Sequence, residues 1–415
     1  MEQNDEFIRV GTTYYKIVDQ PLVNGETVKR RIPWSIEALR QDYGKNFIAD
    51  IPKFDGFCTV PNHLDYNREV GTFYNLYEPI THQLEAGQFP RIKSLMEHIF
   101  GEQYGLGMDY LQLLYEKPTQ KLPVLLLVST ERNTGKTSFL NFLKLIFQDN
   151  VTFNTNEDFR SQFNADWAGK LLILVDEVLL SRREDSERLK NLSTALTYKM
   201  EAKGKDRNEV QFFAKFVLCS NNESFPVIID PEEIRYWVRK VEPLENDDPD
   251  FLRHLEAEVP HFLFHLKHER VLSTKKESRM WFNPALIHTD ALDNIIRHNR
   301  PRAELDMVEL CLDVMERNNL TQYCFCPNDI HALLLNTHVK IEKWQILKVL
   351  KERWQLQPAA NAYRYTTYNI DYTNATNYMA VQRTGRYYTV QRDFLEPLRL
   401  SLIHISEPTR LRCIS

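Results

Sequence analysis

Short, continuous runs of apolar residues mark the middle of the chain. They cover Val124–Val128, 171–175 and 216–219, and each has the length of a single strand. Unbroken apolar runs of this length are typical of strands that are buried on both faces of a parallel sheet. Segments with helical periodicity separate them, for example at 139–146. The pattern therefore predicts an α/β core built on a parallel sheet.

The segments on either side of this core have other patterns. Residues 1–88 are rich in turns and contain short strand-like runs at Phe7–Val10 and 14–18, which predicts an accessory α+β region. Residues 89–300 hold the core and its flanking helices. After a short linker, residues 301–399 have the pattern of helices followed by aromatic-rich strands. This order predicts a winged-helix-like domain at the C-terminal side.

The last segment, residues 400–415, reads LSLIHISEPTRLRCIS. It resembles the translation of a transposase-based sequencing adapter, and we therefore interpret it as a non-native tail. The alternative is a genuine short tail. On the first interpretation, His404 and Cys413 carry no functional information.

Composition narrows the class of protein. The chain has 415 residues, of which 43% are hydrophobic and 26% are charged, as in ordinary soluble globular proteins. It has no apolar run of about 18 residues that would predict a membrane span, and its start lacks the apolar core of a signal peptide. Six scattered cysteines do not form a disulfide framework. These features predict a reduced, cytoplasmic protein. The net charge of -5 argues against a surface that is basic throughout, but it allows a local basic channel.

A loop of the phosphate-binding type follows the first apolar run. The sequence after Val128 is STERNTGKTS, and helical periodicity follows it. A strand, a Gly-Lys-Thr loop and a helix in this order are the context that defines a P-loop. Backbone N–H groups of such a loop surround phosphates, the lysine adds a positive charge, and the threonine offers its hydroxyl to Mg²⁺. The candidate ATP-binding residues are Thr130, Asn133, Thr134, Gly135, Lys136, Thr137 and Ser138.

One position departs from the P-loop pattern. The pattern has glycine where this chain has Thr130. Since glycine eases a tight turn, threonine at this position predicts strain or a changed path of the loop.

Polar residues end the next two apolar runs. The second run ends in Asp176 and Glu177, which is the Walker B arrangement. Asp176 would hold Mg²⁺ together with Thr137, and Glu177 would orient and deprotonate the attacking water. The third run leads into Asn221, whose amide could contact the γ-phosphate or the water. An ordinary charged or polar strand end is the alternative in both cases.

With these elements in order, the chain resembles a superfamily 3 helicase of the AAA+ class, and it is similar to primase-helicase proteins of phages and mobile elements. The resemblance covers about residues 74–300. It rests on the order and spacing of short motifs: Asn75-Leu76-Tyr77-Glu78-Pro79, the Gly-Lys-Thr loop, Phe163-Asn164, Asp176-Glu177, Lys203-Gly204-Lys205, Ser220-Asn221, Arg235-Tyr236 and the stretch SRMWF at 278–282.

The resemblance implies a ring-shaped motor, usually a hexamer, that uses ATP and Mg²⁺ to move on single-stranded or forked DNA in a bacterial host cell. A separate primase is a possible partner under this hypothesis, since the chain shows no primase acids or zinc cysteines. In the family a hairpin enters the central pore, and the matching segment is 199–215. Its DNA-binding candidates are Lys203, Lys205 and Arg207. A solvated basic loop is the alternative.

An arginine that reaches into the ATP site of a neighbouring subunit is also implied. Arg235 fits this role most naturally, with Arg239 as the competing candidate. The catalytic set under this hypothesis is Lys136, Glu177, Asn221 and Arg235. A surface arginine held in a salt bridge is the alternative for Arg235.

Two functions of different classes follow from the same residues. The first is an ATP-dependent DNA helicase of superfamily 3 in phage or mobile-element replication. The second is a nucleic-acid-binding replication or loading factor that binds ATP as a switch and unwinds nothing. A third hypothesis is an AAA+ motor for packaging or initiation. Thr130 favours the second function, and Lys136, Asp176, Glu177 and Asn221 favour the first.

The remaining motifs have weaker interpretations. His261, His265 and His268 share a helix face, which we interpret as a partly solvated face in preference to a metal site. Cys324 and Cys326 lack a second pair at zinc-finger spacing, and we interpret them as packing residues. Basic residues among many tyrosines near the C-terminal side favour either nucleic-acid binding or a packing face. They are Arg364, Arg383, Arg386 and Arg392, with only Asp371 opposing them.

Overall fold

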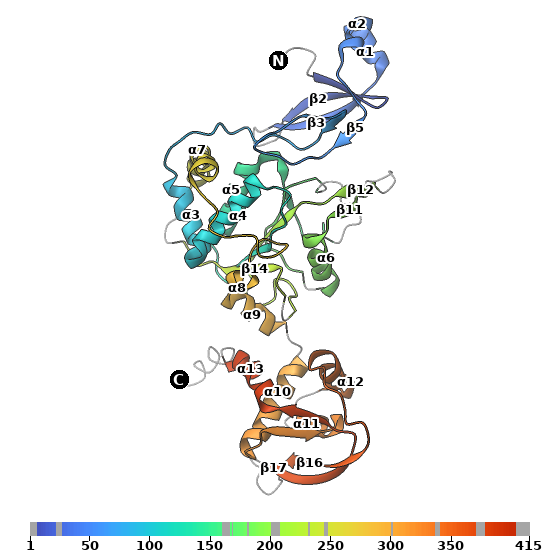
Figure 1. Ribbon diagram of the computed structural model, residues 1–415, viewed down its shortest axis with the longest axis vertical. Helices are drawn as coiled ribbons and strands as arrows, with labels where there is room; N and C mark the ends of the chain where they lie inside the picture. The colour runs from blue at the N-terminus through green and yellow to red at the C-terminus, as the bar shows by residue number, and fades with distance from the viewer. Residues whose placement is uncertain are drawn as a thin grey trace. The chain divides into compact units, whose positions relative to one another are not determined.

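The structure is a computed structural model that describes residues 6–21, 27–159, 167, 169–180, 182–200, 208–230, 233–244, 248–299, 302–336, 341–370 and 378–403. The chain divides into two compact units, Met1–Ile295 and Ile296–Ser415. Each unit has its own hydrophobic core. Figure 1 shows the elements of both units.

The first unit is built on a parallel sheet of five strands, and the fold is therefore mixed α/β, as predicted. The order across the sheet is β14 (Tyr236–Lys240), β8 (Val124–Val128), β13 (Lys215–Ser220), β10 (Leu172–Val175) and β9 (Val151–Asn154), and every neighbouring pair is parallel. All residues of β8, β10 and β13 are buried. The apolar runs at these three positions therefore predicted strands correctly, because strands that are buried on both faces are mostly apolar. In β13 only the two end residues, Lys215 and Ser220, are polar.

The apolar runs did not mark β9 and β14, which form the two edges of this sheet, although the spacing between Lys136 and Asp176 has room for one strand such as β9. Their sequences, VTFN and YWVRK, mix apolar and polar residues. A short mixed run has no clear periodicity, so its strand conformation depends on pairing with a neighbour. β14 forms that pairing with β8, from Tyr236 beside Val124 to Lys240 beside Val128.

A group of helices packs together on one side of the first unit (Figure 1). Rings from three of these helices meet in the core, with centroids 5.7 Å apart for Phe100 and Phe139 and 5.8 Å apart for Phe142 and Phe262. The helices are α3 (Pro90–Phe100), α4 (Tyr104–Glu116), α5 (Lys136–Phe147) and α7 (Phe251–Phe264). The helical face predicted at 139–146 lies in this core, as does the apolar face of α3.

Further elements of the core unit follow the second apolar strand. Helix α6 (Arg183–Thr194) leads into an antiparallel hairpin of β11 (Thr197–Met200) and β12 (Asn208–Gln211), which lies beside it in Figure 1. The hairpin leads back into β13. The short helices α8 (Pro284–Ile287) and α9 (Asp290–His298) come at the end of the unit.

The N-terminal part of the first unit forms two small sheets. One has the order β3-β2-β1-β4, and the other has the order β5-β7-β6. The predicted strands at Phe7–Val10 and 14–18 are confirmed as β1 and as part of β2. The bounds are β1 (Phe7–Val10), β2 (Thr13–Pro21), β3 (Thr27–Trp34), α1 (Ile36–Tyr43), α2 (Lys45–Asp50), β4 (Lys53–Phe54), β5 (Gly56–Cys58), β6 (Glu69–Val70) and β7 (Phe73–Asn75).

The second unit combines helices with two antiparallel strand pairs. β15 pairs with β18, and β16 forms a hairpin with β17. The elements are α10 (Arg302–Arg317), β15 (Gln322–Phe325), α11 (Pro327–Asn336), α12 (Lys343–Lys348), β16 (Tyr363–Ile370), β17 (Tyr378–Gly385), β18 (Tyr388–Gln391) and α13 (Arg392–Ile403). The first residues of the tail at 400–415 belong to α13, and the rest of that segment lies outside the described residues.

Candidate nucleotide-binding site

The predicted phosphate loop connects β8 to the start of α5. Gly135 is the residue before the helix and has a φ of 77°, a left-handed conformation that favours glycine. A Cβ atom at this position would lie 3.4 Å from Cδ1 of Leu244. Asn133 also has a positive φ, of 55°, and asparagine tolerates this region better than most residues. The loop therefore turns at Asn133 and Gly135.

Lys136 is nearly buried at the first position of α5. Its ammonium group donates a hydrogen bond of 2.8 Å to the hydroxyl of Thr134. Burial lowers the pKa of Lys136, while the carboxylates of Asp176 and Glu223 act in the opposite direction. A partly desolvated ammonium group gains more from an anionic ligand than a solvated one does.

Thr137 and Asp176 face each other across the site. The Thr137 hydroxyl donates a hydrogen bond of 2.8 Å to Oδ2 of Asp176, although α5 carries the first residue and the end of β10 leads to the second. The other oxygen of Asp176 accepts a bond of 3.1 Å from the backbone N–H of Glu177. A hydroxyl and a carboxylate at this separation are hard oxygen donors of the kind that Mg²⁺ prefers.

Glu177 and Asn221 meet at the ends of adjacent strands. The Asn221 amide nitrogen lies 3.5 Å from Oε1 of Glu177. Two bonds fix this approach, because Val178 N–H donates to the Cys219 carbonyl at 2.7 Å and the Ser220 hydroxyl donates to the Val178 carbonyl at 2.9 Å. Glu177 itself is exposed and has a φ of 54°. Its carboxylate is therefore accessible from solvent.

These groups line one cavity of about 520 Å³. Most of the candidate residues from the loop and from the strand ends thus come together, although they are far apart in the sequence. Arg132 also lines the cavity and was not among the candidates. The lining consists of Arg132, Asn133, Thr134, Gly135, Lys136, Thr137, Ser138, Asp176, Glu177 and Asn221.

Thr130 lies outside the lining of this cavity. Its side chain is exposed, and it is absent from the residues with positive φ. Its backbone N–H donates a bond of 3.0 Å to Oε1 of Glu223. Threonine therefore fits at this residue without the strain of a left-handed conformation. A changed path of the loop stays a prediction.

Three distant residues hold the loop and were not found from the sequence. Glu223 accepts the bond from Thr130. His98 donates from Nε2 to the Thr134 carbonyl at 3.1 Å, and Leu244 N–H donates to the Asn133 carbonyl at 2.9 Å. Only Glu223 lies close to a recognised motif, two positions after Asn221, so nothing in the sequence marks the other two.

The two arginine candidates have different environments. Arg235 comes directly before β14, at the end of the sheet opposite the phosphate loop, and donates to Glu233 at 2.9 Å. Its Nε is buried and lacks a hydrogen-bond partner among the described residues. Arg239 lies within β14, is 8% exposed, and donates to Glu102 and Gln103 at 2.5 and 3.0 Å. The guanidinium group of Arg239 is therefore already held by hydrogen bonds within its own chain.

The predicted DNA hairpin is described only at its base. Lys203, Lys205 and Arg207 lie outside the described residues, as do Phe163 and Asn164. Lys215 ends the segment 199–215 that matches the family's pore hairpin, but it does not belong to the hairpin of β11 and β12. It is the first residue of β13, is 2% exposed, and donates from Nζ to the Pro118 carbonyl.

The other candidates have local partners. His261 contacts the Glu85 carbonyl at 2.9 Å and His265 contacts Glu269 at 2.8 Å. No cluster that could hold a metal ion occurs in the described ranges. Cys324 lies 3.5 Å from the Thr389 hydroxyl, and Cys326 N–H donates to Asp329 at 2.9 Å.

Two of the four candidate arginines of the second unit form ion pairs with acidic residues. Arg383 donates to the buried Asp329 at 2.6 Å and Arg392 donates to Glu396 at 2.7 Å. Asp371 was expected to be the only opposing acid, which is wrong for these two arginines. Arg386 donates to the Ala359 carbonyl at 2.9 Å. Arg364 is exposed on β16 and lines a cavity of about 450 Å³ with Tyr365, Tyr368 and Tyr387, among other residues.

Comparison with known proteins agrees with this fold. Residues 127–239 match DUF5906, a family of unknown function, and this stretch extends from β8 to β14. The chain is similar to a solved structure described as the apo structure of the NrS-1 C-terminal region (305–718), with a TM-score of 0.61 and 17% identity over 92% of this chain and 95% of that chain. An A-form apo structure of the same region has a TM-score of 0.59 and 18% identity over 89% and 94%. No curated protein matches.

At these identities the likeness concerns the fold alone. In addition, no helix in the described part of the chain is long and apolar enough to cross a membrane.

Proposed function

We propose that this protein binds and hydrolyses ATP with Mg²⁺, and that it serves phage or mobile-element replication as a superfamily 3 DNA helicase. The observation that carries the proposal is the contact between Thr137 and Asp176 at 2.8 Å, in the same cavity as Lys136 and Glu177. Hydroxyl, carboxylate, ammonium and a second carboxylate are the groups that nucleotide hydrolysis requires.

Each residue has a defined task in this proposal. Backbone N–H groups of the loop and of the start of α5 would bind the phosphates, and Lys136 would neutralise their charge. Thr137 and Asp176 would hold Mg²⁺, which neutralises charge on the phosphate oxygens when bound. Glu177 would orient the water and accept its proton, and Asn221 would keep the Glu177 carboxylate in place.

The helicase part of the proposal rests on the resemblance to superfamily 3 and on the hairpin of β11 and β12. A ring of subunits would place this hairpin near a DNA strand and Arg235 near the ATP of a neighbour. The bond between Arg235 and Glu233 would then have to open when subunits assemble. The AAA+ assignment of the core and the winged-helix assignment of the second unit are part of the same proposal.

The test is ATP hydrolysis by the full chain with and without single-stranded DNA. Lys136→Ala should lose ATP binding, and Glu177→Gln should keep binding but lose turnover by a factor of about 100 or more. Glu184→Gln on the exposed side of α6 is a matched control and should keep full turnover.

The outcomes separate the proposed functions. Turnover that DNA stimulates and that Glu177→Gln removes would support a motor, and strand displacement would then be measured directly. ATP binding without turnover would exclude the motor and leave an ATP-dependent switch. Turnover that survives in Glu177→Gln would contradict the role given to that carboxylate.

A further inference from the structure

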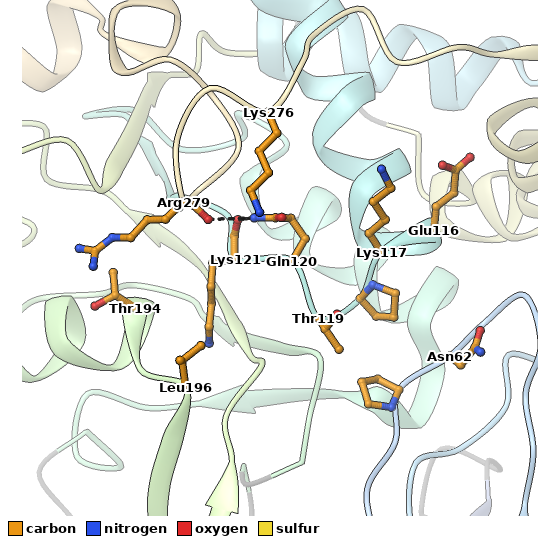
Figure 2. Close-up of a pocket in the computed structure, with 12 residues that line it drawn as sticks. Asn62, Glu116, Lys117, Thr119, Gln120, Lys121, Thr194, Leu196, Lys276 and Arg279 are labelled. Carbon is orange, nitrogen blue, oxygen red and sulfur yellow. Dashed lines mark hydrogen bonds between the residues drawn. The ribbon is translucent and has the colours of Figure 1, made fainter.

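A second cavity, of about 800 Å³, lies at the opposite end of the parallel sheet from the nucleotide site. The segment 116–121 lines it and leads into β8, whereas the phosphate loop follows the end of β8. Figure 2 shows this segment on one side of the cavity, with Lys276 and Arg279 coming from another part of the chain. Gln120 connects the two parts, because its amide donates to the Arg279 carbonyl at 2.9 Å.

The lining is strongly cationic, although the whole chain has a net charge of -5. The cations are Lys117, Lys121, Lys276 and Arg279. Among the described residues that line the cavity, only Glu116 is acidic, and it accepts a hydrogen bond of 2.8 Å from Gln112. An excess of positive charge in one hollow attracts an anion and concentrates it there.

Two lysines near this cavity are buried without a carboxylate partner in the part of the chain that the structure describes. Lys121 is 9% exposed and donates to the Phe212 carbonyl at 2.5 Å. Lys215 is 2% exposed and donates to the carbonyl of Pro118, which lines the cavity. Burial lowers the pKa of Lys121 to about 8, and burial together with the charge of Lys121 lowers the pKa of Lys215. Burial disfavours the charged form of a lysine unless an anion pairs with it. An anion in the cavity would supply that counter-charge to Lys121, which lines it.

The surroundings favour an extended ligand. Leu196 lies at the cavity with 76% of its surface exposed, directly before the hairpin strand β11. The hollow is large and the cations come from separate segments, so they could contact successive charges along a chain. A nucleic-acid strand has phosphates at regular spacing and apolar base faces that could contact Leu196.

We propose that this cavity binds the phosphate groups of a single-stranded nucleic acid at the base of the β11–β12 hairpin. The inference that an anion binds here depends only on the positive charge of the lining and on the burial of Lys121. The choice of a nucleic-acid strand over another polyanion rests on the proposed function. Lys276 and Arg279 would make the outer contacts, and Lys121 would make the inner one.

The test measures binding of a fluorescein-labelled oligo(dT) to the full chain by anisotropy. The cavity variant is Lys276→Glu with Arg279→Glu, two exposed side chains whose replacement leaves the core intact. The control is Arg253→Glu with Lys267→Glu, which makes the same charge change on exposed positions outside the cavity. Loss of phosphate contacts should weaken the cavity variant at least about tenfold and reduce its salt dependence, whereas the control should change less than about twofold.

Equal binding by the cavity variant and wild type, or equal weakening of both variants, would overturn the proposal, as would a wild type that binds no oligo(dT). An oligo(dT) with an uncharged methylphosphonate backbone should no longer distinguish wild type from the cavity variant. If it still does, phosphate is not the ligand. If poly-glutamate binds more tightly than oligo(dT), and only in proteins with an intact cavity, the partner is an acidic protein segment.

Binding of a fluorescent ATP analogue is measured in the same proteins. It should be equal in wild type, the cavity variant and the control, because the two sites lie at opposite ends of the sheet. A wild type that binds oligo(dT) through the cavity but binds no nucleotide would overturn the proposed ATPase function and leave the anion site supported.

Discussion

The hydroxyl of Thr137 lies 2.8 Å from a carboxylate oxygen of Asp176, across 39 residues of sequence. This contact connects the first turn of α5 with the end of β10. It exists because β13 lies between β8 and β10 in the sheet, with all three strands parallel, so the ends of β8 and β10 open toward the same edge. Side chains that follow these strands can therefore act on one ligand.

Removal of the Thr137 hydroxyl should weaken Mg²⁺-dependent nucleotide binding. Thr137→Val keeps the shape of the side chain, so the loss should reflect the hydroxyl alone. We expect a loss of about tenfold or more in affinity for Mg-ATP, in line with the ~1.5–3 kcal/mol of a hydrogen bond to a charged group. Thr137→Ser restores the hydroxyl and should restore binding. If Thr137→Val binds Mg-ATP as wild type does, the metal role of this residue is excluded.

Gly135→Ala should distort the phosphate loop. The φ of 77° costs an L-residue roughly 1–2 kcal/mol. The added Cβ would lie in contact with Leu244 at 3.4 Å without a clash, so the cost comes from the backbone conformation. We expect a lower melting temperature and weaker ATP binding, measured by thermal unfolding and by titration. The control is Gly44→Ala, because Gly44 also has a positive φ, of 83°, and an added Cβ would meet no atom within 4 Å. Gly87→Ala is unsuitable as a control, because its Cβ would clash with His261 and its φ is not left-handed. Gly44→Ala should lower stability without changing ATP binding.

Asp109 should be essential for the stability of the first unit. It is fully buried in α4 and accepts bonds from Arg270, Ser273 and Thr274, including 2.5 Å from Arg270. Asp109→Ala leaves the Arg270 charge without its partner, which costs about 3–5 kcal/mol for a buried pair. Urea unfolding should show this loss. Asp50→Ala, at the exposed end of α2, should change stability little, and an equally stable Asp109→Ala would contradict the importance of the network.

His63 should make the first unit sensitive to acid. Its ring contacts the Tyr115 carbonyl at 2.8 Å and the Tyr77 hydroxyl at 2.6 Å, and burial lowers its pKa to about 4. In the unfolded chain the His63 ring has its ordinary pKa of about 6.5, whereas in the folded chain it stays neutral until the pH falls to about 4. The contribution of His63 to the free energy of unfolding is therefore complete above pH 6.5. It falls by a few kcal/mol as the pH decreases toward 4.

His63→Gln should flatten the fall in unfolding free energy between pH 6.5 and 4, at the cost of lower stability at neutral pH. His268→Gln, at an exposed position, is the control and should keep the wild-type pH dependence. Parallel pH curves for wild type and His63→Gln would show that other groups cause the acid sensitivity.

The local pattern predicted those parts of the fold that are governed by burial and by short motifs. The apolar runs became β8, β10 and the middle of β13, because strand segments that are covered on both faces consist mostly of apolar side chains. The loop around Gly135 and Lys136 was found for a similar reason, since its conformation and its charge require particular residue types in one short stretch.

Contacts between distant segments were decided only by the tertiary structure. Nothing in the local sequence marks His98 or Leu244 as supports of the phosphate loop, and the mixed sequence of β14 becomes a strand through its pairing with β8. The position of Lys215 at the end of the segment 199–215 suggested that it belongs to the basic hairpin. The packing buries it beneath a cationic cavity instead, because the start of β13 lies inside the sheet and Pro118 approaches it from 97 residues away.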